Sequence, residues 1–419
     1  MMKVVGLITE YNPFHLGHKY HLETAKHLAN ADYSIALMSG SFVQRGEPSL
    51  VDKWTKAKMA VDSGVDLVIE LPFIFSVQSA ELFAYGGVSL LDQLNIVDYL
   101  VFGTELDELE PLAEIAHLLY VEPPFYKKRL RENLNMGYSF PLSRSNAIED
   151  YLTMKGLNIS NKTDVKNILK KSNNILAIEY LKALESLDSK IKPIAVKRVG
   201  NQYNDTTLNN NIASATAIRK ALNNHPVEYI KNYVPIETYS HLVNYINKYK
   251  YFNTLNNYNQ IVHYLLCTKD RKQLTEIMDM EPGLENRIVY KANKYKDIDK
   301  LVESISTKRY PRTRIQRILV HIMMDLTHST FEVLKPYHPA YIRVLGSNKK
   351  GFILLNKIKE KSELPIITKF ADYKKYNNPH LEKILYFDKK ATDLFFIGLK
   401  NLKPFIHMDY YTTPYIMKK

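Results

Sequence analysis

Two histidines near the start of the chain have a spacing suited to phosphate chemistry. His15 and His18 stand in the run Asn-Pro-Phe-His-Leu-Gly-His of residues 12–18. An apolar run typical of a β-strand precedes them at residues 4–8, and helical periodicity follows at residues 18–29. Backbone N–H groups at a helix start attract phosphate, and paired imidazoles can donate hydrogen bonds to a phosphoryl group under attack. The run therefore predicts an ATP site at a strand-to-helix turn.

The histidine pair has two other interpretations. A zinc site would need further ligands, but no cysteine stands nearby and the chain has no His-Glu-x-x-His pattern. We therefore predict no metal site built by the protein itself. Two surface histidines in a polar loop are the remaining alternative.

A second group of residues has the composition of a phosphate-binding helix start. Ser214, Thr216 and Arg219 lie in the run Ser-Ala-Thr-Ala-Ile-Arg. Hydroxyl residues cap a helix and offer donors to phosphate, and an arginine one turn later suits the β- and γ-phosphates. The alternative is an ordinary helix cap followed by a surface arginine.

The elements that must position these groups alternate along the chain. Apolar runs predict strands at residues 4–8, 33–38, 65–71, 99–102 and 193–199, with amphipathic helices between the first four. This order predicts a Rossmann-like, doubly wound parallel sheet with helices on its faces. Because ligands bind beyond the carboxyl ends of such strands, we expect the residues after the first, second and fourth strands to line one crevice. Those segments are residues 9–18, 39–47 and 103–105.

The charge of the chain changes near residue 250. Residues 1–250 carry 27 Lys and Arg against 27 Asp and Glu, whereas residues 251–419 carry 30 against 17, so this part accounts for the whole net charge of +13. We predict an ATP-binding catalytic domain at residues 1–245 and a mainly helical basic domain at 246–419. A one-sided basic excess is typical of a polyanionic partner such as RNA, although a solvated basic surface is the alternative. The residues predicted to contact such a partner are Arg312, Arg314, Arg317, Arg343, Lys349 and Lys350.

The composition also excludes several classes of protein. No run of about 18 apolar residues could span a membrane, and the first residues lack the features of a signal peptide. The single cysteine, Cys267, rules out an internal disulfide framework and fits a reducing cytosol. We expect a cytoplasmic enzyme with no membrane partner and a buried, inert Cys267; the sequence leaves the oligomeric state open.

The two chemical motifs together resemble the His-x-Gly-His superfamily of nucleotidyltransferases. Longer runs are similar to the bacterial tRNA(Met) cytidine acetate ligase family and cover nearly the whole chain. These runs are residues 6–18, 38–48, 66–72, 102–105, 173–176, 213–219, 283–288, 312–317 and 343–346.

The resemblance implies an ATP-dependent ligase that activates acetate as acetyl-adenylate, releases pyrophosphate, and acetylates N4 of the wobble cytidine, C34, of elongator tRNA(Met). His15, His18 and Lys19 would be catalytic, and Mg²⁺ would bridge the phosphates. A small-molecule adenylyltransferase and a non-catalytic RNA-binding protein are the alternatives. The ATP site implied by the resemblance and the motifs comprises Ile8, Thr9, Glu10, Tyr11, Asn12, Pro13, Phe14, His15, Leu16, Gly17, His18, Lys19, Tyr20, His21, Gly103, Asn173, Arg198, Val199, Ser214, Thr216 and Arg219.

Overall fold

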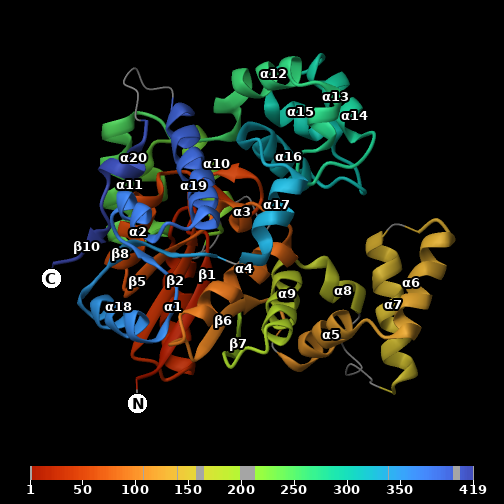
Figure 1. Cartoon of the computed structure of the whole chain (residues 1–419), viewed down its shortest axis with the longest axis horizontal. Helices are drawn as coiled ribbons and strands as arrows, with labels where there is room; N and C mark the ends of the chain where they lie inside the picture. The colour runs from red at the N-terminus through yellow and green to blue at the C-terminus, as the bar shows by residue number, and fades with distance from the viewer. Residues whose placement is uncertain are drawn as a thin grey trace.

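One mixed sheet of eight strands organises the chain (Figure 1). The computed structural model describes residues 2–106, 108–138, 140–156, 165–198, 213–337, 339–399 and 406–418. The strand order is β10-β8-β5-β2-β1-β6-β7, with β9 paired to β8. The strands are β1 (Val4–Thr9), β2 (Tyr33–Ser39), β5 (Leu67–Leu71), β6 (Tyr99–Thr104), β7 (Lys192–Lys197), β8 (Ile342–Ser347), β9 (Ile366–Ile367) and β10 (Tyr415–Ile416).

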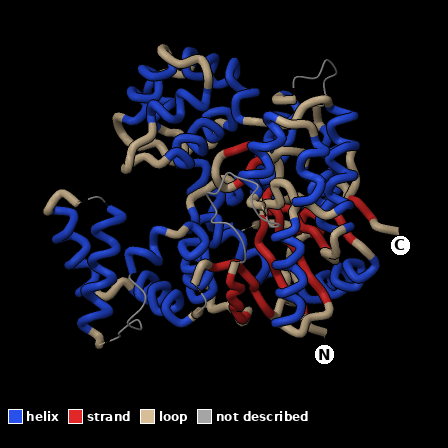
Figure 2. Tube along the Cα trace, turned by 180° about the vertical axis from the view of Figure 1, so that it is seen from behind, coloured by secondary structure: helices blue, strands red, loops and turns tan. Residues whose placement is uncertain are grey.

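The central strands are mainly apolar because helices cover both faces of the sheet. Val4, Val5 and Leu7 in β1 are fully buried, as is the whole of β5. Figure 2 shows the strands enclosed by helices. Ten of the helices up to residue 249 are α1 (Leu16–Leu28), α2 (Lys53–Asp62), α3 (Phe73–Ser76), α4 (Ala80–Gln93), α5 (Glu110–Val121), α8 (Val165–Lys170), α9 (Ser172–Ser186), α10 (Ala215–Asn224), η1 (Val227–Tyr233) and α11 (Ile236–Tyr249).

The predicted fold class is confirmed, with one difference in the sheet. The pairs β1–β2, β2–β5, β1–β6 and β6–β7 are parallel, as expected. However, β8 pairs with β5 in the antiparallel direction, and β9 and β10 pair with β8. All three strands lie beyond residue 246, so the division predicted at that residue does not follow the sheet. Helical elements of this later part of the chain include η2 (Leu255–Tyr258), α17 (His328–Leu334), η3 (Lys335–Tyr337), α18 (Lys349–Lys361), η4 (Phe370–Tyr376), α19 (Pro379–Ile397) and α20 (Met408–Tyr411).

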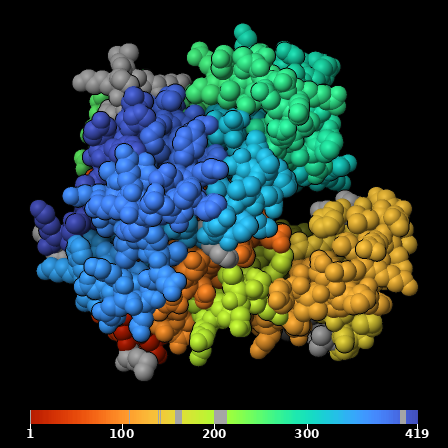
Figure 3. Space-filling model, in the orientation of Figure 1, coloured from red at the N-terminus to blue at the C-terminus, as the bar shows by residue number. Residues whose placement is uncertain are grey.

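Two groups of helices stand away from the sheet in Figure 1. One is the hairpin of α6 (Pro124–Asn135) and α7 (Phe140–Met154), and the surface between it and the other group is hollowed in Figure 3. Contrary to expectation, Cys267 in the second group is exposed. None of the described helices is long and apolar enough to cross a bilayer. The second group contains α12 (Asn259–Thr268), α13 (Arg271–Thr275), α14 (Leu284–Ala292), α15 (Ile298–Ile305) and α16 (Arg312–Met324).

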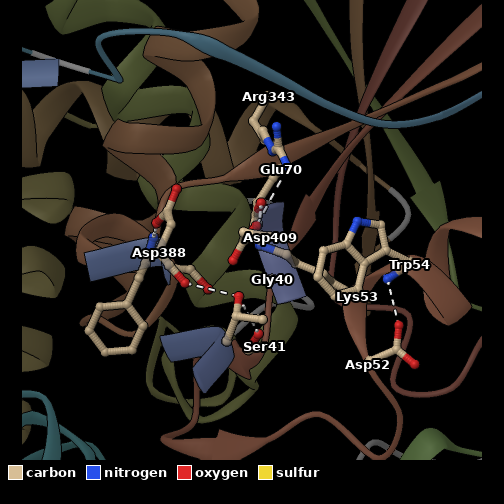
Figure 4. Close-up of polar contacts among 12 residues, drawn as sticks. Gly40, Ser41, Asp52, Lys53, Trp54, Glu70, Arg343, Asp388 and Asp409 are labelled. Atoms are coloured by element: carbon tan, nitrogen blue, oxygen red, sulfur yellow. Dashed lines mark hydrogen bonds and ion pairs between the residues drawn. The ribbon is translucent and has the colours of Figure 1, made fainter. Parts of the chain in front are cut away.

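A buried cluster of charges joins the last strands and helices to the centre of the sheet (Figure 4). Lys53 of α2 contacts both carboxylate oxygens of Glu70 at 2.9 Å and Asp409 of α20 at 2.8 Å. Arg343 of β8 lies 3.5 Å from Asp409. We call Lys53, Glu70, Arg343, Asp388 and Asp409 the ion cluster. The prediction that Arg343 contacts tRNA is therefore wrong, because its side chain is 1% exposed and lies inside this cluster.

Candidate functional site

A cavity of about 440 Å³ opens at the carboxyl ends of β1, β6 and β7. Thr9, Gln44 and Gly103 all line it, which confirms that the three segments expected to converge do so. The N-termini of α1 and α10 also face it through His15, Gly17 and Ala215. Two helix starts at one cavity favour a ligand with several negative charges.

The two motif histidines hold each other and the start of α1. His15 is the N-cap, and its Nδ1 accepts a hydrogen bond from the Gly17 N–H at 3.1 Å. The Nδ1 of His18 accepts from the His15 N–H at 3.3 Å, and the two rings stack with centroids 3.7 Å apart. Since each Nδ1 accepts a bond, the hydrogen of each neutral ring is on Nε2. Each Nε2–H can then donate to a ligand.

The environment keeps these histidines uncharged near neutral pH. Burial, with the guanidinium groups of Arg198 and Arg219, lowers the pKa of His15 to about 3. Burial and the neighbouring His15 hold the pKa of His18 well below its ordinary value, and burial with Arg198 lowers that of His21 to about 4. The rings therefore act as neutral donors, while the positive charge comes from the arginines.

Arg219 crosses from α10 to the turn after β1. Its Nη1 donates to the carbonyl oxygen of Asn12 at 2.9 Å, and its Nη2 donates to Glu47 at 3.1 Å. Ser214 caps α10 by accepting from the Ala217 N–H at 3.1 Å. The predicted helix cap is thus present, and the arginine that follows it lines the same cavity as the histidines.

The opposite wall of the cavity is built on Glu105 after β6. Its carboxylate accepts from the Asn173 side chain at 2.6 Å and from the Asn174 N–H at 3.0 Å. A Cβ at Gly103 would lie 3.2 Å from Cγ of Arg198, so a glycine lets this arginine lie against β6. Asn173, Gly103 and Arg198 all line the cavity.

Most of the predicted ATP-site residues lie around the cavity, but a few do not. Pro13, Phe14 and Leu16 pack beside it; the Phe14 ring lies 5.6 Å from that of His18. Val199 lies outside the described residues. Lys19 does not line the cavity, because the residue after His18 is turned by about 100° around the helix. The lining includes the predicted residues Ile8, Thr9, Glu10, Tyr11, Asn12, His15, Gly17, His18, Tyr20, His21, Gly103, Asn173, Arg198, Ser214, Thr216 and Arg219.

Sequence reasoning missed the apolar wall and one helix of the cavity. Phe83, Phe102 and Tyr180 line it, although each is typical of an ordinary core position. Thr313 and Arg317 of α16 also line it. Of these residues only Arg317 has a function predicted from the sequence, and the predicted function is a tRNA contact.

The other basic residues predicted to contact tRNA differ in availability. Lys349 and Lys350 are exposed at the start of α18, and Arg312 is exposed and paired with Asp299. Arg314 is paired with Glu281 at 2.7 Å, and Arg317 is nearly buried against Asp279 at 2.8 Å. The lysines are therefore better placed for a macromolecular partner than the two paired arginines.

Comparisons with known proteins show the family of the chain. A model of the HIGH Nucleotidyl Transferase family matches residues 2–407. The tRNA(Met) cytidine acetate ligase of Thermoanaerobacter sp. strain X514 is 42% identical over 402 residues, which is 96% of each chain. The protein of that name from Clostridium perfringens strain SM101 is 40% identical and covers the full length of both chains.

Solved structures show the same architecture. The crystal structure of Thermotoga maritima TmcAL bound with alpha-thio ATP matches with a TM-score of 0.91 and 33% identity over 99% of each chain. Its apo form matches with a TM-score of 0.94, over 99% of this chain and 100% of that one. The full-length similarity extends from the histidine motif to the last strands of the sheet. The chain belongs to the tRNA(Met) cytidine acetate ligase family of HIGH nucleotidyl transferases.

Proposed function

We propose that the protein is an ATP-dependent ligase that activates acetate as acetyl-adenylate and acetylates N4 of the wobble cytidine, C34, of elongator tRNA(Met). The observation that carries the proposal is the arrangement of neutral His15 and His18 opposite Arg219 in one cavity. The names of the full-length relatives and the ATP analogue bound by the Thermotoga maritima protein support it.

The first half-reaction needs positioning and charge neutralisation more than a general base. An acetate oxygen attacks the α-phosphorus of ATP, the bond to the β-phosphate oxygen breaks, and pyrophosphate leaves. The Nε2–H groups of the two histidines donate to the α-phosphate, where negative charge develops. Arg219 and the N–H groups at the start of α10 bind the β- and γ-phosphates. They therefore stabilise the negative charge of the pyrophosphate as it leaves.

We expect Mg²⁺ to bind together with ATP and not at a preformed metal site of the protein. Among the described residues no group of three or more His, Cys, Asp or Glu could hold a metal. Glu10 is the cavity's lining carboxylate, and it already accepts from the Gln44 N–H at 2.9 Å. Glu10 would be the protein group available to a Mg²⁺ bound with ATP, and the ion would supply positive charge to the phosphates.

The second half-reaction needs cytosine N4 beside the acetyl-adenylate. The nucleophilic nitrogen attacks the acetyl carbonyl carbon, the bond to the AMP oxygen breaks, and a proton leaves N4. An anticodon base must be unstacked to reach the cavity. The charge excess in residues 251–419, including exposed Lys349 and Lys350, supports an RNA partner for this part of the chain.

One assay tests the proposal. The protein is incubated with ATP, labelled acetate and total bacterial tRNA, and the tRNA is digested to nucleosides. We expect label in N4-acetylcytidine, released from elongator tRNA(Met). ATP cleavage without label in tRNA would favour a small-molecule adenylyltransferase, and absence of ATP binding would contradict both enzymes. We further propose that the protein works in the cytoplasm, where its tRNA substrate is found.

A further inference from the structure

One carboxylate links Arg219 to a helix more than 90 residues further along the chain. Glu47 belongs to β4 (Glu47–Pro48), which pairs with β3 (Phe42–Val43) in a short hairpin. Its Oε2 accepts from Arg219 Nη2 at 3.1 Å, and its Oε1 accepts from Gln316 Nε2 of α16 at 3.2 Å. Glu47 does not line the cavity; it lies behind the arginine that does.

The hairpin that carries Glu47 is fixed against α16 by close backbone packing. Gly46 has φ +77°, and a Cβ there would lie 2.3 Å from the Arg317 nitrogen and 2.5 Å from the Gln316 carbonyl carbon. Any side chain at Gly46 would push the hairpin off the helix. The position of the Glu47 carboxylate is therefore set by α16 as much as by its own strand.

The same helix contributes to the cavity wall. Thr313 and Arg317 line the cavity, and Arg317 is held by the Asp279 carboxylate at 2.8 Å. Arg219 is thus held from two directions, by the Asn12 carbonyl oxygen after β1 and by Glu47 of β4, which Gln316 ties to α16. A movement of α16 relative to the sheet would change the direction of the guanidinium.

We propose that Glu47 is a positioning residue that holds Arg219 for transfer at the α-phosphorus, and that Gln316 makes α16 part of this restraint. The proposal rests on the proposed function for the reaction that it positions. The carboxylate competes with phosphate for the guanidinium, so it weakens ATP binding in the ground state. It also restricts the orientation of the Arg219 guanidinium. Without this restraint the guanidinium could bind the ground-state phosphates in an orientation that does not fit the transition state.

This role predicts opposite effects on binding and on rate in Glu47→Gln. The two bonds use different carboxylate oxygens, and the amide puts an NH₂ group in place of one of them, so either Arg219 or Gln316 loses its acceptor there. Loss of the negative charge beside the phosphate site should tighten ATP binding about three- to tenfold. Loss of the fixed direction of Arg219 should slow acetyl-adenylate formation about 10- to 100-fold. A purely structural role would weaken binding and rate together.

The experiment measures both quantities on the full-length protein without tRNA. Titration calorimetry with ATP in the absence of acetate gives the affinity, and acetate-dependent pyrophosphate exchange at saturating ATP gives the rate. Glu281→Gln is the matched control, because Glu281 pairs with Arg314 of the same helix at 2.7 Å and neither residue lines the cavity. We expect both quantities to stay at the wild-type level in the control.

The proposal is overturned if Glu47→Gln binds ATP no more tightly than the wild type. It is also overturned if this variant exchanges pyrophosphate at the wild-type rate. Gln316→Leu removes one bond to the carboxylate and should slow exchange about three- to tenfold. An unchanged rate in that variant would overturn the role assigned to α16. If the wild type binds ATP but shows no acetate-dependent exchange, the proposed function fails, and the affinity result alone decides the role of Glu47.

Discussion

The ATP cavity and the ion cluster both hold buried titratable side chains, yet their charges are arranged in opposite ways. In the ion cluster burial opposes the charge of Lys53, but Asp409 and Glu70 raise its pKa above the ordinary value. In the cavity, burial and two nearby arginines all act in one direction and lower the pKa of His15. No carboxylate compensates the histidine.

This difference separates a structural charge network from a binding site. The charges of Lys53 and Arg343 lie against Glu70 and Asp409 inside the protein, and none of these residues lines the cavity. The Nε2–H groups of His15 and His18 have no acceptor among the described residues, and they face a cavity. Unmet hydrogen-bonding capacity alone does not distinguish the two regions, because the buried guanidinium of Arg343 also lacks a hydrogen-bond partner. The two histidines differ from it because they line a cavity.

The largest effect should come from the cavity. His18→Ala removes one donor to the α-phosphate, so acetyl-adenylate formation should fall about 100- to 1000-fold. Affinity for tRNA should stay near that of the wild type. Acetate-dependent pyrophosphate exchange and tRNA binding measure the two properties. His27→Ala, at an exposed position near the end of the same helix, is the control. A normal exchange rate in His18→Ala would remove this ring from the reaction.

The ion cluster should respond through stability instead. Lys53→Met leaves Glu70 and Asp409 buried with their lysine removed, which should reduce the free energy of unfolding by about 3–5 kcal/mol. Urea denaturation measures it. Lys357→Met breaks an exposed pair with Glu360 and should change stability by less than about 1 kcal/mol. Equal losses in the two variants would show that the buried cluster contributes no more than a surface pair.

The two regions should also respond to pH with opposite signs. The folded pKa of His21 is about 4 against an ordinary 6.5, so the unfolded chain binds the extra proton between these values. Stability then falls as pH is lowered through that window, by up to about 1.4 kcal/mol per pH unit. Burial and Glu70 raise the pKa of Asp388 from 3.8 to about 8, so here stability falls as pH rises.

Urea denaturation across both pH windows measures these slopes. The two windows overlap between pH 4 and 6.5, where the two contributions oppose each other. His21→Gln should therefore make stability fall more steeply with rising pH in this range, whereas Asp388→Asn should make stability rise with pH from 4 to 6.5 and remove the fall between pH 6.5 and 8. Each variant serves as the control for the other. The assignment fails if either variant leaves its own slope at the wild-type value.

The smallest effect should come from the exposed lysines at the start of α18, which belong neither to the cavity nor to the ion cluster. Lys349→Ala with Lys350→Ala should weaken tRNA binding several-fold and lower the dependence of log affinity on log salt by about 1.4–1.8. Fluorescence anisotropy over a series of salt concentrations measures both. Lys357→Ala with Lys361→Ala changes two exposed lysines at the other end of α18 and should have a smaller effect. Equal effects of the two double variants on tRNA binding would show that Lys349 and Lys350 form no specific contact with tRNA.

The sequence predicted the parts of the fold and site whose signals are local. The strands at β1, β2, β5, β6 and β7 are apolar runs, and the histidine motif lies directly at a helix start. Lys19 lies outside the cavity lining, which its adjacency to His18 in the motif did not indicate, and its catalytic role stays a prediction.

What the sequence did not reveal depends on contacts between distant segments. The charge of Arg343 indicated a surface residue, whereas its partner Asp409 lies 66 positions further along and makes it part of the core. Because of this charge, the sequence did not predict the strand β8, whose other residues are also buried. Likewise, nothing local connects Glu47 to Gln316, which lie 269 positions apart.

The pairing of β8 with β5 has a consequence for how the chain is made. During synthesis the first strands can associate while the ribosome is still producing the helices after residue 250. The edge of β5 nevertheless stays open until residues 342–347 emerge. An unpaired apolar edge is a template for other strands. The nascent chain must therefore protect this edge through the synthesis of about 270 residues, and a fragment ending at residue 245 would expose it permanently.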